Sequence, residues 1–407
     1  MKKNILVNTL LVVGVVSGTF LMLESFIECN FITKTPVKFH FALPAGLATL
    51  AQSSKADCIP NHYIAIAGDS YAQGKGDWLL EVDPDGNDAF HSAHVLQRLT
   101  GRDVISFGKS GASNIKGWVR EPIARYRFIR EKIDNAVEEP AIVLAYFYSG
   151  NDLLENTLEI QEFFFPQYGE GALSDNKAWD QYFLASIEKR NVGPYSEFDS
   201  NTGWLPKAIY QIVRNELKSK KMSEELGDIE IQQTGIINSV WINGEEINIP
   251  DVLQSPGLEL SERETEIGFV AVENSLRYLK QYFHRSQVIV VYIPSVIESY
   301  AKVSDKVSVS NITATEPEKF AEIHDSSELW QRSNDIADRV KSIASSLGVP
   351  FIDTRLQIRA ASEKKMIHGS IDWKHFNREG YEALASSIVS GLIGYGTIPP
   401  LPSHEDK

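Results

Sequence analysis

The sequence contains little cysteine and too few positive charges to balance its acids. Two cysteines among 407 residues cannot form a disulfide framework or a four-cysteine zinc site. Asp and Glu outnumber Lys and Arg by 54 to 40, which gives a net charge of −14. An acidic surface repels phosphate backbones, so nucleic acid is not expected as a partner. No segment recurs at a period of about 20–50 residues, which excludes a solenoid or propeller.

The remaining composition is that of an ordinary globular protein, with 43% hydrophobic and 23% charged residues. This composition excludes a wholly disordered, collagen-like or coiled-coil chain. The length allows two average domains, or one large domain with an insertion.

An apolar stretch near the N-terminus indicates export. Lys2 and Lys3 precede a charge-free run over residues 4–23, and Glu24 follows it. About twenty helical residues span the hydrocarbon core of a bilayer, and the positive-inside rule places everything after this run outside the cytoplasm. We therefore predict a membrane anchor over residues 1–25, with a cleaved signal peptide as the alternative. Either way the protein is expected to be membrane-anchored or secreted, with its catalytic domain outside the cytoplasm.

Residues 26–60 are predicted to form a linker, because prolines and a glycine interrupt any periodic pattern there. Cys29 and Cys58 lie at the two ends of this segment. In an oxidising compartment they can form a disulfide, or they can stay as two thiols. Neither cysteine has a histidine nearby in sequence, so a catalytic role is not expected.

Short apolar runs predict the strands of a parallel sheet, at residues 62–67, 103–107, 141–148, 287–293 and 350–354. Helices are predicted near residues 88–100, 114–138 (with a break or new start at Pro122), 261–284, 326–346 and 377–392. Continuous apolar strands separated by helices indicate a parallel sheet covered on both faces. The predicted fold is therefore α/β, a three-layer αβα domain with a flavodoxin-like, doubly wound sheet of about five strands.

The predicted catalytic domain is discontinuous, with parts at residues 61–152 and 261–395 and a tail at 396–407. Residues 153–260 form an insertion, because no simple βα connection needs such length. Its first half is rich in aromatic residues. They predict either a small core of its own or a lid with aromatic platforms over the site; they are Phe163, Phe164, Phe165, Tyr168, Trp179, Tyr182, Phe183, Tyr195, Phe198 and Trp204.

Polar motifs follow the first three predicted strands, at residues 68–70, 109–113 and 149–152. A fourth motif, residues 372–375, precedes the last helix. Ligands of open α/β sheets bind at the carboxyl ends of the strands, so we expect the four motifs to meet. Each motif is common by itself. Their order and complementary chemistry carry the information.

The chemistry of these residues fits nucleophilic acyl transfer. A serine hydroxyl such as that of Ser70 attacks only when a base takes its proton. His375 is a suitable base, and Asp372, three residues earlier, can orient it and stabilise the imidazolium. The developing oxyanion needs donors, which the backbone N–H groups of Ser70 and Gly111 and the side-chain amide of Asn151 can supply. No metal or cofactor is required.

These motifs resemble those of the SGNH/GDSL hydrolase family, over about residues 62–392 without the insertion. GDSY at 68–71 resembles its first block, SFGKSGAS at 106–113 its second, SGND at 149–152 its third and DWKHFNREGY at 372–381 its fifth. The resemblance implies a Ser70–His375–Asp372 triad, with Ser70, Gly111 and Asn151 forming the oxyanion hole. The sequence departs from the family pattern at Tyr71, where leucine is usual, and in its long insertion.

Several other residues are weaker candidates. His368 competes with His375 as the base, and His91 and His94 share a helix face with metal-pair spacing but no carboxylate to complete a site. His324 is a further histidine outside the motifs. Trp78 and Trp373 flank the motif loops and either line the pocket or pack against the domain.

The sequence thus favours an exported serine esterase that removes acyl groups, acetyl first, from a carbohydrate or another envelope substrate. The alternatives are an O-acyltransferase that acts on an exported polysaccharide beside a membrane-bound partner, a lipase or thioesterase, and a glycan-binding protein with a vestigial site. The four intact motifs disfavour the last of these.

Overall fold

The structure is a computed structural model. It describes residues 11–27 (without 12, 24 and 25), 40, 43, 45–57, 59–77, 92–133, 137–190, 209–214 (without 212), 238–310 (without 252) and 321–399. Cys29, Cys58, Trp78 and His91 lie outside this part of the chain.

A five-stranded parallel sheet forms the centre of the domain, in the order β2-β1-β3-β6-β9. Its strands are β1 (Ile64–Ala67), β2 (Val104–Ser106), β3 (Ile142–Tyr148), β6 (Gln287–Ile293) and β9 (Phe351–Asp353). All five lie within the predicted apolar runs, because strands buried on both faces need continuous apolar sequence. The strand order reverses at β1, which has β2 on one side and β3 on the other. The predicted α/β class and doubly wound sheet are confirmed.

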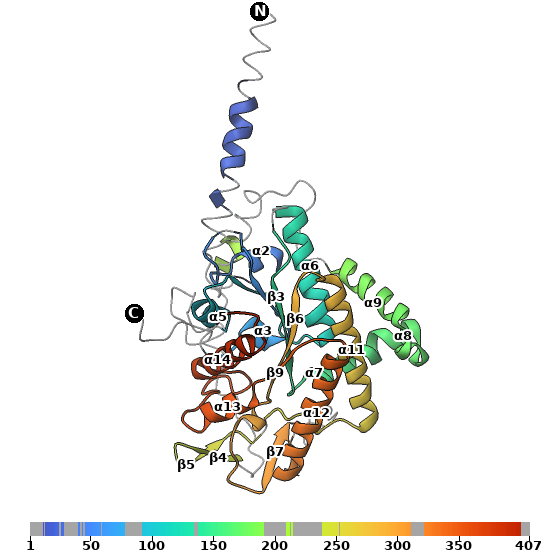
Figure 1. The fold of residues 1–407 in the computed structure, drawn as a ribbon, viewed down its shortest axis with the longest axis vertical. Coiled ribbons are helices and arrows are strands. Elements are labelled where there is room, and N and C mark those ends of the chain that lie inside the picture. The colour runs from blue at the N-terminus through green and yellow to red at the C-terminus, as the bar shows by residue number, and fades with distance from the viewer. Residues whose placement is uncertain are drawn as a thin grey trace, which may run out of the picture.

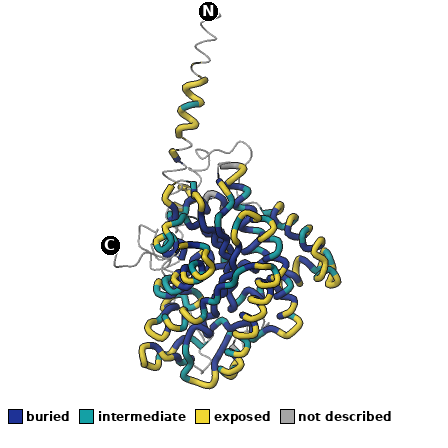
Figure 2. Tube along the Cα trace, in the orientation of Figure 1, coloured by how far each residue is buried: buried dark blue, intermediate teal, exposed yellow. Residues whose placement is uncertain are grey.

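Helices cover both faces of the sheet (Figure 1). One face carries α5 (Ser92–Thr100), α13 (Arg355–Ser362) and α14 (Arg378–Gly394). The other carries α6 (Glu121–Phe128), α11 (Glu262–Tyr282) and α12 (Ser326–Ser346). Alternate strand residues point to each face, so Figure 2 shows a continuous buried centre between exposed helix surfaces.

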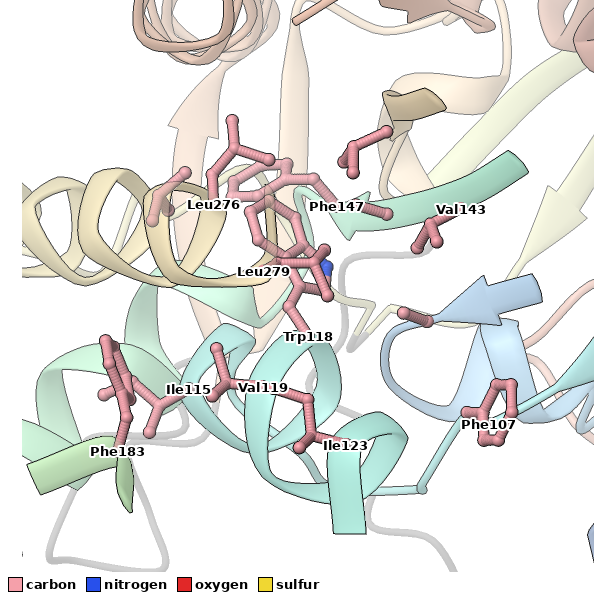
Figure 3. Close-up of a cluster of buried hydrophobic side chains, with 14 of the residues drawn as sticks. Phe107, Ile115, Trp118, Val119, Ile123, Val143, Phe147, Phe183, Leu276 and Leu279 are labelled. Carbon is pink, nitrogen blue, oxygen red and sulfur yellow. The ribbon is translucent and has the colours of Figure 1, made fainter. Parts of the chain in front are cut away.

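The helical run after β2 supplies much of one apolar layer. It comprises η3 (Ile115–Arg120), α6 and η4 (Ile129–Ile133). The backbone hydrogen-bond spacing changes from π-helical to α-helical at Glu121, next to Pro122, which has no N–H to donate. Trp118 is fully buried and donates its indole N–H to the carbonyl of Tyr146 in β3, at 2.7 Å. Figure 3 shows Trp118 beside Phe147 and Leu279, where this run packs under the sheet and against α11.

The described parts of residues 153–260 are three stretches, 153–190, 209–214 (without 212) and 238–260 (without 252). The helices α7 (Asp152–Glu159), η5 (Ile160–Phe164), α8 (Phe165–Tyr168), η6 (Glu170–Ser174) and α9 (Asn176–Lys189) extend the layer of α6 and α11. Phe164 and Trp179 stack there at 4.4 Å between ring centroids, and both are fully buried. These aromatic residues therefore pack into the main core, and Phe163 stays 40% exposed.

Two antiparallel hairpins lie beyond the carboxyl end of the sheet, at the foot of Figure 1. They are β4 (Asn238–Ile242) with β5 (Glu245–Ile249), and β7 (Lys306–Ser310) with β8 (Ala321–Asp325). Asn238 joins them, since its side-chain amide donates to the carbonyl of Ser308 at 2.8 Å and accepts from the N–H of Ser308 at 2.8 Å. Neither hairpin was expected from the apolar pattern.

No helix among the described residues is long and apolar enough to cross a membrane. Residues 1–10, 12, 24 and 25 of the predicted anchor lie outside those residues. Within the predicted linker, α2 (Ala45–Leu50) and the residues after it pack against the edge strand β2. There the side chain of Gln52 donates to the carbonyl of Ser106 at 2.6 Å and accepts from its N–H at 2.8 Å, which closes that edge of the sheet.

Candidate active site

Ser70 lies where β1 ends and the short helix α3 (Ser70–Gln73) begins. Asp69 caps this helix, because its carboxylate accepts from the N–H of Tyr71 at 2.9 Å. Ser70 is 5% exposed, and its hydroxyl donates to the same carboxylate at 3.3 Å. Burial raises the pKa of Asp69 above its ordinary value, opposed by the N–H of Tyr71 and the charge on His375.

His375 and Asp372 form a hydrogen-bonded pair in the loop before α14. His375 Nδ1 lies 2.6 Å from Asp372 Oδ2, and both side chains are mostly buried. Burial by itself would raise the pKa of Asp372, but the hydrogen bond and charge of His375 outweigh it, so the pKa lies below its ordinary value. An ionised Asp372 then holds the imidazole with Nε2 free to act as a base. No hydrogen bond joins Ser70 to His375 within the described residues, so proton transfer requires the Ser70 hydroxyl to turn away from Asp69.

Asp77, which the sequence did not single out, and Tyr71, which stood out only as a departure from the family pattern, fix this loop to the Ser70 turn. The carboxylate of Asp77, 3% exposed, accepts from the N–H groups of Ile371 at 3.2 Å and Asp372 at 2.5 Å. Tyr71 donates its hydroxyl to the carbonyl of Lys374 at 2.9 Å, and its ring centroid lies 5.5 Å from that of His375. The leucine that is usual in the resembled family could not make this hydrogen bond.

Gly111 and Asn151 follow β2 and β3, the two neighbours of β1, so their loops lie at the same edge of the sheet as Ser70. Gly111 is exposed and has a φ of +65°, a conformation that favours glycine. Asn151 precedes α7 but makes no side-chain cap, and its Oδ1 is buried without a hydrogen-bond partner among the described residues. The amide of Asn151 is therefore not engaged in holding the helix start, and it can donate to an oxyanion.

A buried polar network holds these two loops together. Asp152 accepts from the side-chain amide of Asn114 at 2.8 Å and from the N–H of Tyr148 at 3.0 Å. Asn114 and Asn156 exchange two further hydrogen bonds, of 2.8 Å and 2.7 Å. Burial and the charge of Asp69 raise the pKa of Asp152 well above its ordinary value. The loop with Gly111 is thus fixed relative to Asn151 by side chains directly behind it.

Replacing Asn151 with alanine is expected to lower kcat on an ester substrate by about 10²–10³, because one oxyanion donor is lost in the transition state. The melting temperature should stay close to that of the native protein, because the Asn151 side chain makes no capping hydrogen bond to α7. Steady-state kinetics and thermal unfolding check both parts. A kcat within threefold of the native value would remove Asn151 from the oxyanion hole.

The competing histidines occupy other environments. His368 is fully buried, its Nδ1 lies 3.0 Å from the hydroxyl of Tyr300, and it makes no contact with a carboxylate among the described residues. His94 Nε2 lies 2.8 Å from the hydroxyl of Ser53, which belongs to none of the four motifs. His324 Nδ1 lies 3.2 Å from Glu328. Only His375, among the described histidines, is paired with an acid inside the motif cluster.

The burial of His368 predicts a pH dependence of stability. Burial lowers its pKa from 6.5 to about 3, so below pH 6.5 the unfolded chain binds a proton that the folded chain does not. The free energy of unfolding should therefore fall with falling pH, by about 1.4 kcal/mol per pH unit between pH 6.5 and 4. Urea unfolding of the native protein and of His368→Gln at several pH values tests this. The variant should show a shallower slope by that amount, and equal slopes would contradict it.

Trp373 packs over Gly369, since a Cβ on that glycine would lie 2.7 Å from the indole ring. The position of Trp373 therefore fits a packing role within this loop. Among the residues that the structure describes, no group of three or more His, Cys, Asp or Glu side chains is placed to hold a metal ion.

No protein-family model and no curated protein matches the chain. Solved structures similar to it include the lipase/acylhydrolase from Enterococcus faecalis, at 12% identity and a TM-score of 0.33, covering 84% of this chain and 99% of that one. An acetyl xylan esterase from Butyrivibrio proteoclasticus matches at 10% identity and a TM-score of 0.36, covering 83% of this chain and 65% of that one. The extracellular lipase from Streptomyces rimosus matches at 14% identity and a TM-score of 0.35, covering 81% of this chain and 98% of that one. Similarity at this level gives no information on substrate.

Proposed function

We propose that the protein is a serine esterase of the SGNH type, with Ser70 as nucleophile, His375 as base and Asp372 as its partner. The observation that carries this proposal is the 2.6 Å contact between His375 Nδ1 and Asp372, in a loop that Tyr71 and Asp77 tie to the Ser70 turn. A histidine paired in this way, next to a serine at a strand end, is the arrangement that acyl transfer requires.

In the proposed reaction Ser70 Oγ attacks the ester carbonyl while its proton moves to His375 Nε2. Asp372 stabilises the imidazolium that forms. The N–H groups of Ser70 and Gly111 and the amide of Asn151 stabilise the oxyanion. The C–O bond to the alcohol then breaks, the alcohol takes the proton from His375, and an acyl-serine remains. A water molecule, deprotonated by His375, releases the acid and restores Ser70.

We infer that the acyl group is short, acetyl first, and that the alcohol belongs to a carbohydrate or another envelope substrate. Phe163, which is 40% exposed in a basic lining that includes Lys109 of the second motif, supports a sugar. The same acyl-serine passes its acyl group to a sugar hydroxyl in an O-acyltransferase, and a longer acyl chain would make the protein a lipase or thioesterase.

The reaction is tested with the full chain and p-nitrophenyl esters of acetate, butyrate and octanoate, with and without a xylose oligosaccharide as acceptor. Release of acetate without acceptor, faster than release of octanoate, supports the esterase. Release that requires the oligosaccharide and leaves acetyl on it supports the transferase. Absence of turnover and of any covalent adduct with all three esters would contradict the proposed serine chemistry.

We propose also that the domain acts outside the cytoplasm. Lys2 and Lys3 precede the charge-free run, and its described apolar residues are exposed, including Leu11 at 61% and Met22 at 77%. Alkaline phosphatase fused after residue 407, which is active only outside the cytoplasm, should therefore be active. The same fusion without residues 1–25 is the control and should be inactive. An inactive fusion of the full chain, with normal protein levels, would contradict the prediction.

A further inference from the structure

A pocket of about 490 Å³ lies between the helices of the insertion and the helical run that follows the second motif. Lys116, Arg120 and Glu121 line it from η3 and α6. Its opposite wall comes from α7–α9, and Lys109 reaches it from the second motif. The mechanism proposed above uses none of these side chains.

The pocket is basic although the chain is strongly acidic. Five cationic and only two acidic side chains line it, whereas the whole chain carries a net charge of −14. The cations are Lys109, Lys116, Arg120, Lys189 and Arg190.

Both acidic side chains of the lining already form ion pairs with basic side chains. Glu121, 1% exposed, accepts from Arg190 at 2.6 Å and from Arg125 at 3.2 Å. Glu159, 3% exposed, pairs with Lys116 and accepts from the hydroxyl of Tyr182 at 3.1 Å. Two carboxylates cannot balance five cations, so the lining keeps a net positive charge.

The other three cations of the lining are two exposed lysines and one arginine. Lys109 and Lys189 are exposed. Arg120 Nε is buried and has no hydrogen-bond partner among the described residues, with the nearest carboxylate oxygen, on Glu121, at 3.7 Å. A buried guanidinium N–H without an acceptor is costly, and an anionic group in the pocket would satisfy it.

The pocket adjoins the candidate active site through Lys109. The N–H of Lys109 donates to the carbonyl of Gly68 at 3.0 Å, and Gly68 lies two residues before Ser70. Two residues span at most about 7 Å, so the backbone of Lys109 lies within about 10 Å of Ser70. A short oligosaccharide spans such a distance. Phe163 is 40% exposed in the same lining, with Lys116 Nζ 5.6 Å from its ring centroid, and its exposed part is available to a sugar.

We propose that this pocket binds an acidic group, a carboxylate or a sulfate, on the substrate, so that the enzyme acts on esters of an anionic glycan. This inference rests on the proposed function for the reaction, but the binding itself does not require turnover. Lys109, Lys189 and Arg120 would hold the anion, Phe163 would contact its sugar ring, and the glycan would extend past Lys109 towards Ser70.

Calorimetric titration of Ser70→Ala, in the otherwise full chain, tests the pocket without hydrolysis. The probes are a galacturonic acid trisaccharide, a sulfated galactose trisaccharide and a neutral galactose trisaccharide. We expect at least one acidic probe to bind at least tenfold more tightly than the neutral one, with an affinity that falls as salt rises. Which acidic probe binds more tightly identifies the anion.

The double change Lys109→Gln with Lys189→Gln should weaken that binding about tenfold, the loss of two exposed charge contacts. Lys364→Gln with Lys365→Gln is the matched control, because these two lysines line a different groove, between α13 and α14. It should leave the affinity unchanged. Equal affinity for acidic and neutral probes, or equal effects of the two double changes, would overturn the proposal. If either result is found while a serine-directed reagent still labels native Ser70, the pocket proposal fails and the esterase proposal is retained.

Discussion

Ser70→Ala is expected to lower kcat for p-nitrophenyl acetate by about 10⁶, since the attacking atom itself is removed and the covalent route is closed. His375→Ala should cause a loss of similar size, because without its base the hydroxyl keeps its proton. The two losses should not add in the double variant, since both residues serve the same step. Steady-state rates of the three variants, against the native protein, provide the measurement.

The matched control is Ser390→Ala, an exposed serine on α14 whose hydroxyl donates only to the carbonyl of Ser386 among the described residues. It should retain native kinetics. Because His368 is buried and bonded to Tyr300, His368→Gln should retain most of the rate as well. Loss of activity in His368→Gln, with activity kept in His375→Ala, would transfer the role of base to His368.

Asp372→Asn is expected to lower kcat by about 10⁴ with little change in the fold. An amide at this position no longer accepts the Nδ1 proton reliably, so the imidazole adopts the wrong tautomer and its cation loses its stabilising charge. The backbone around residue 372 should hold its place, since Asp77 accepts from the N–H groups of Ile371 and Asp372 whatever the side chain. Kinetics and circular dichroism together measure the effect.

A comparison with Asp77→Asn separates the two acids. Asp77 orients the loop through backbone contacts and does not touch His375 in the described structure, so its loss should lower kcat less than Asp372→Asn does. Rates that fall equally in both variants, or a rate for Asp372→Asn within tenfold of native, would contradict the assigned pairing.

The sheet was predictable because its strands are buried on both faces and therefore uninterrupted in apolar sequence. The predicted run at 287–293 coincides with β6, and the predicted helix at 326–346 coincides with α12. The hairpin β4–β5 was not predictable in this way. Its second strand leaves residues such as Glu245 and Glu246 exposed, so it has no apolar run to mark it.

The contacts that position the predicted site could not be found from the sequence. Asp77 lies 294 and 295 positions from the two residues whose N–H groups it accepts, and no local pattern connects them. Tyr71 stood out in the sequence only as a departure from leucine, whereas its hydroxyl donates to the carbonyl of Lys374. The pairing of Asp372 with His375 was predictable, because their spacing of three residues is local.

The central claim is that Ser70 is a nucleophile activated by His375. The most direct measurement is covalent labelling of the full chain by a serine-directed fluorophosphonate, followed by mass spectrometry of the modified peptide. The account predicts one phosphonyl group, attached to Ser70, in the native protein, and none in Ser70→Ala or His375→Ala. A label on any other serine, or undiminished labelling of His375→Ala, would contradict it.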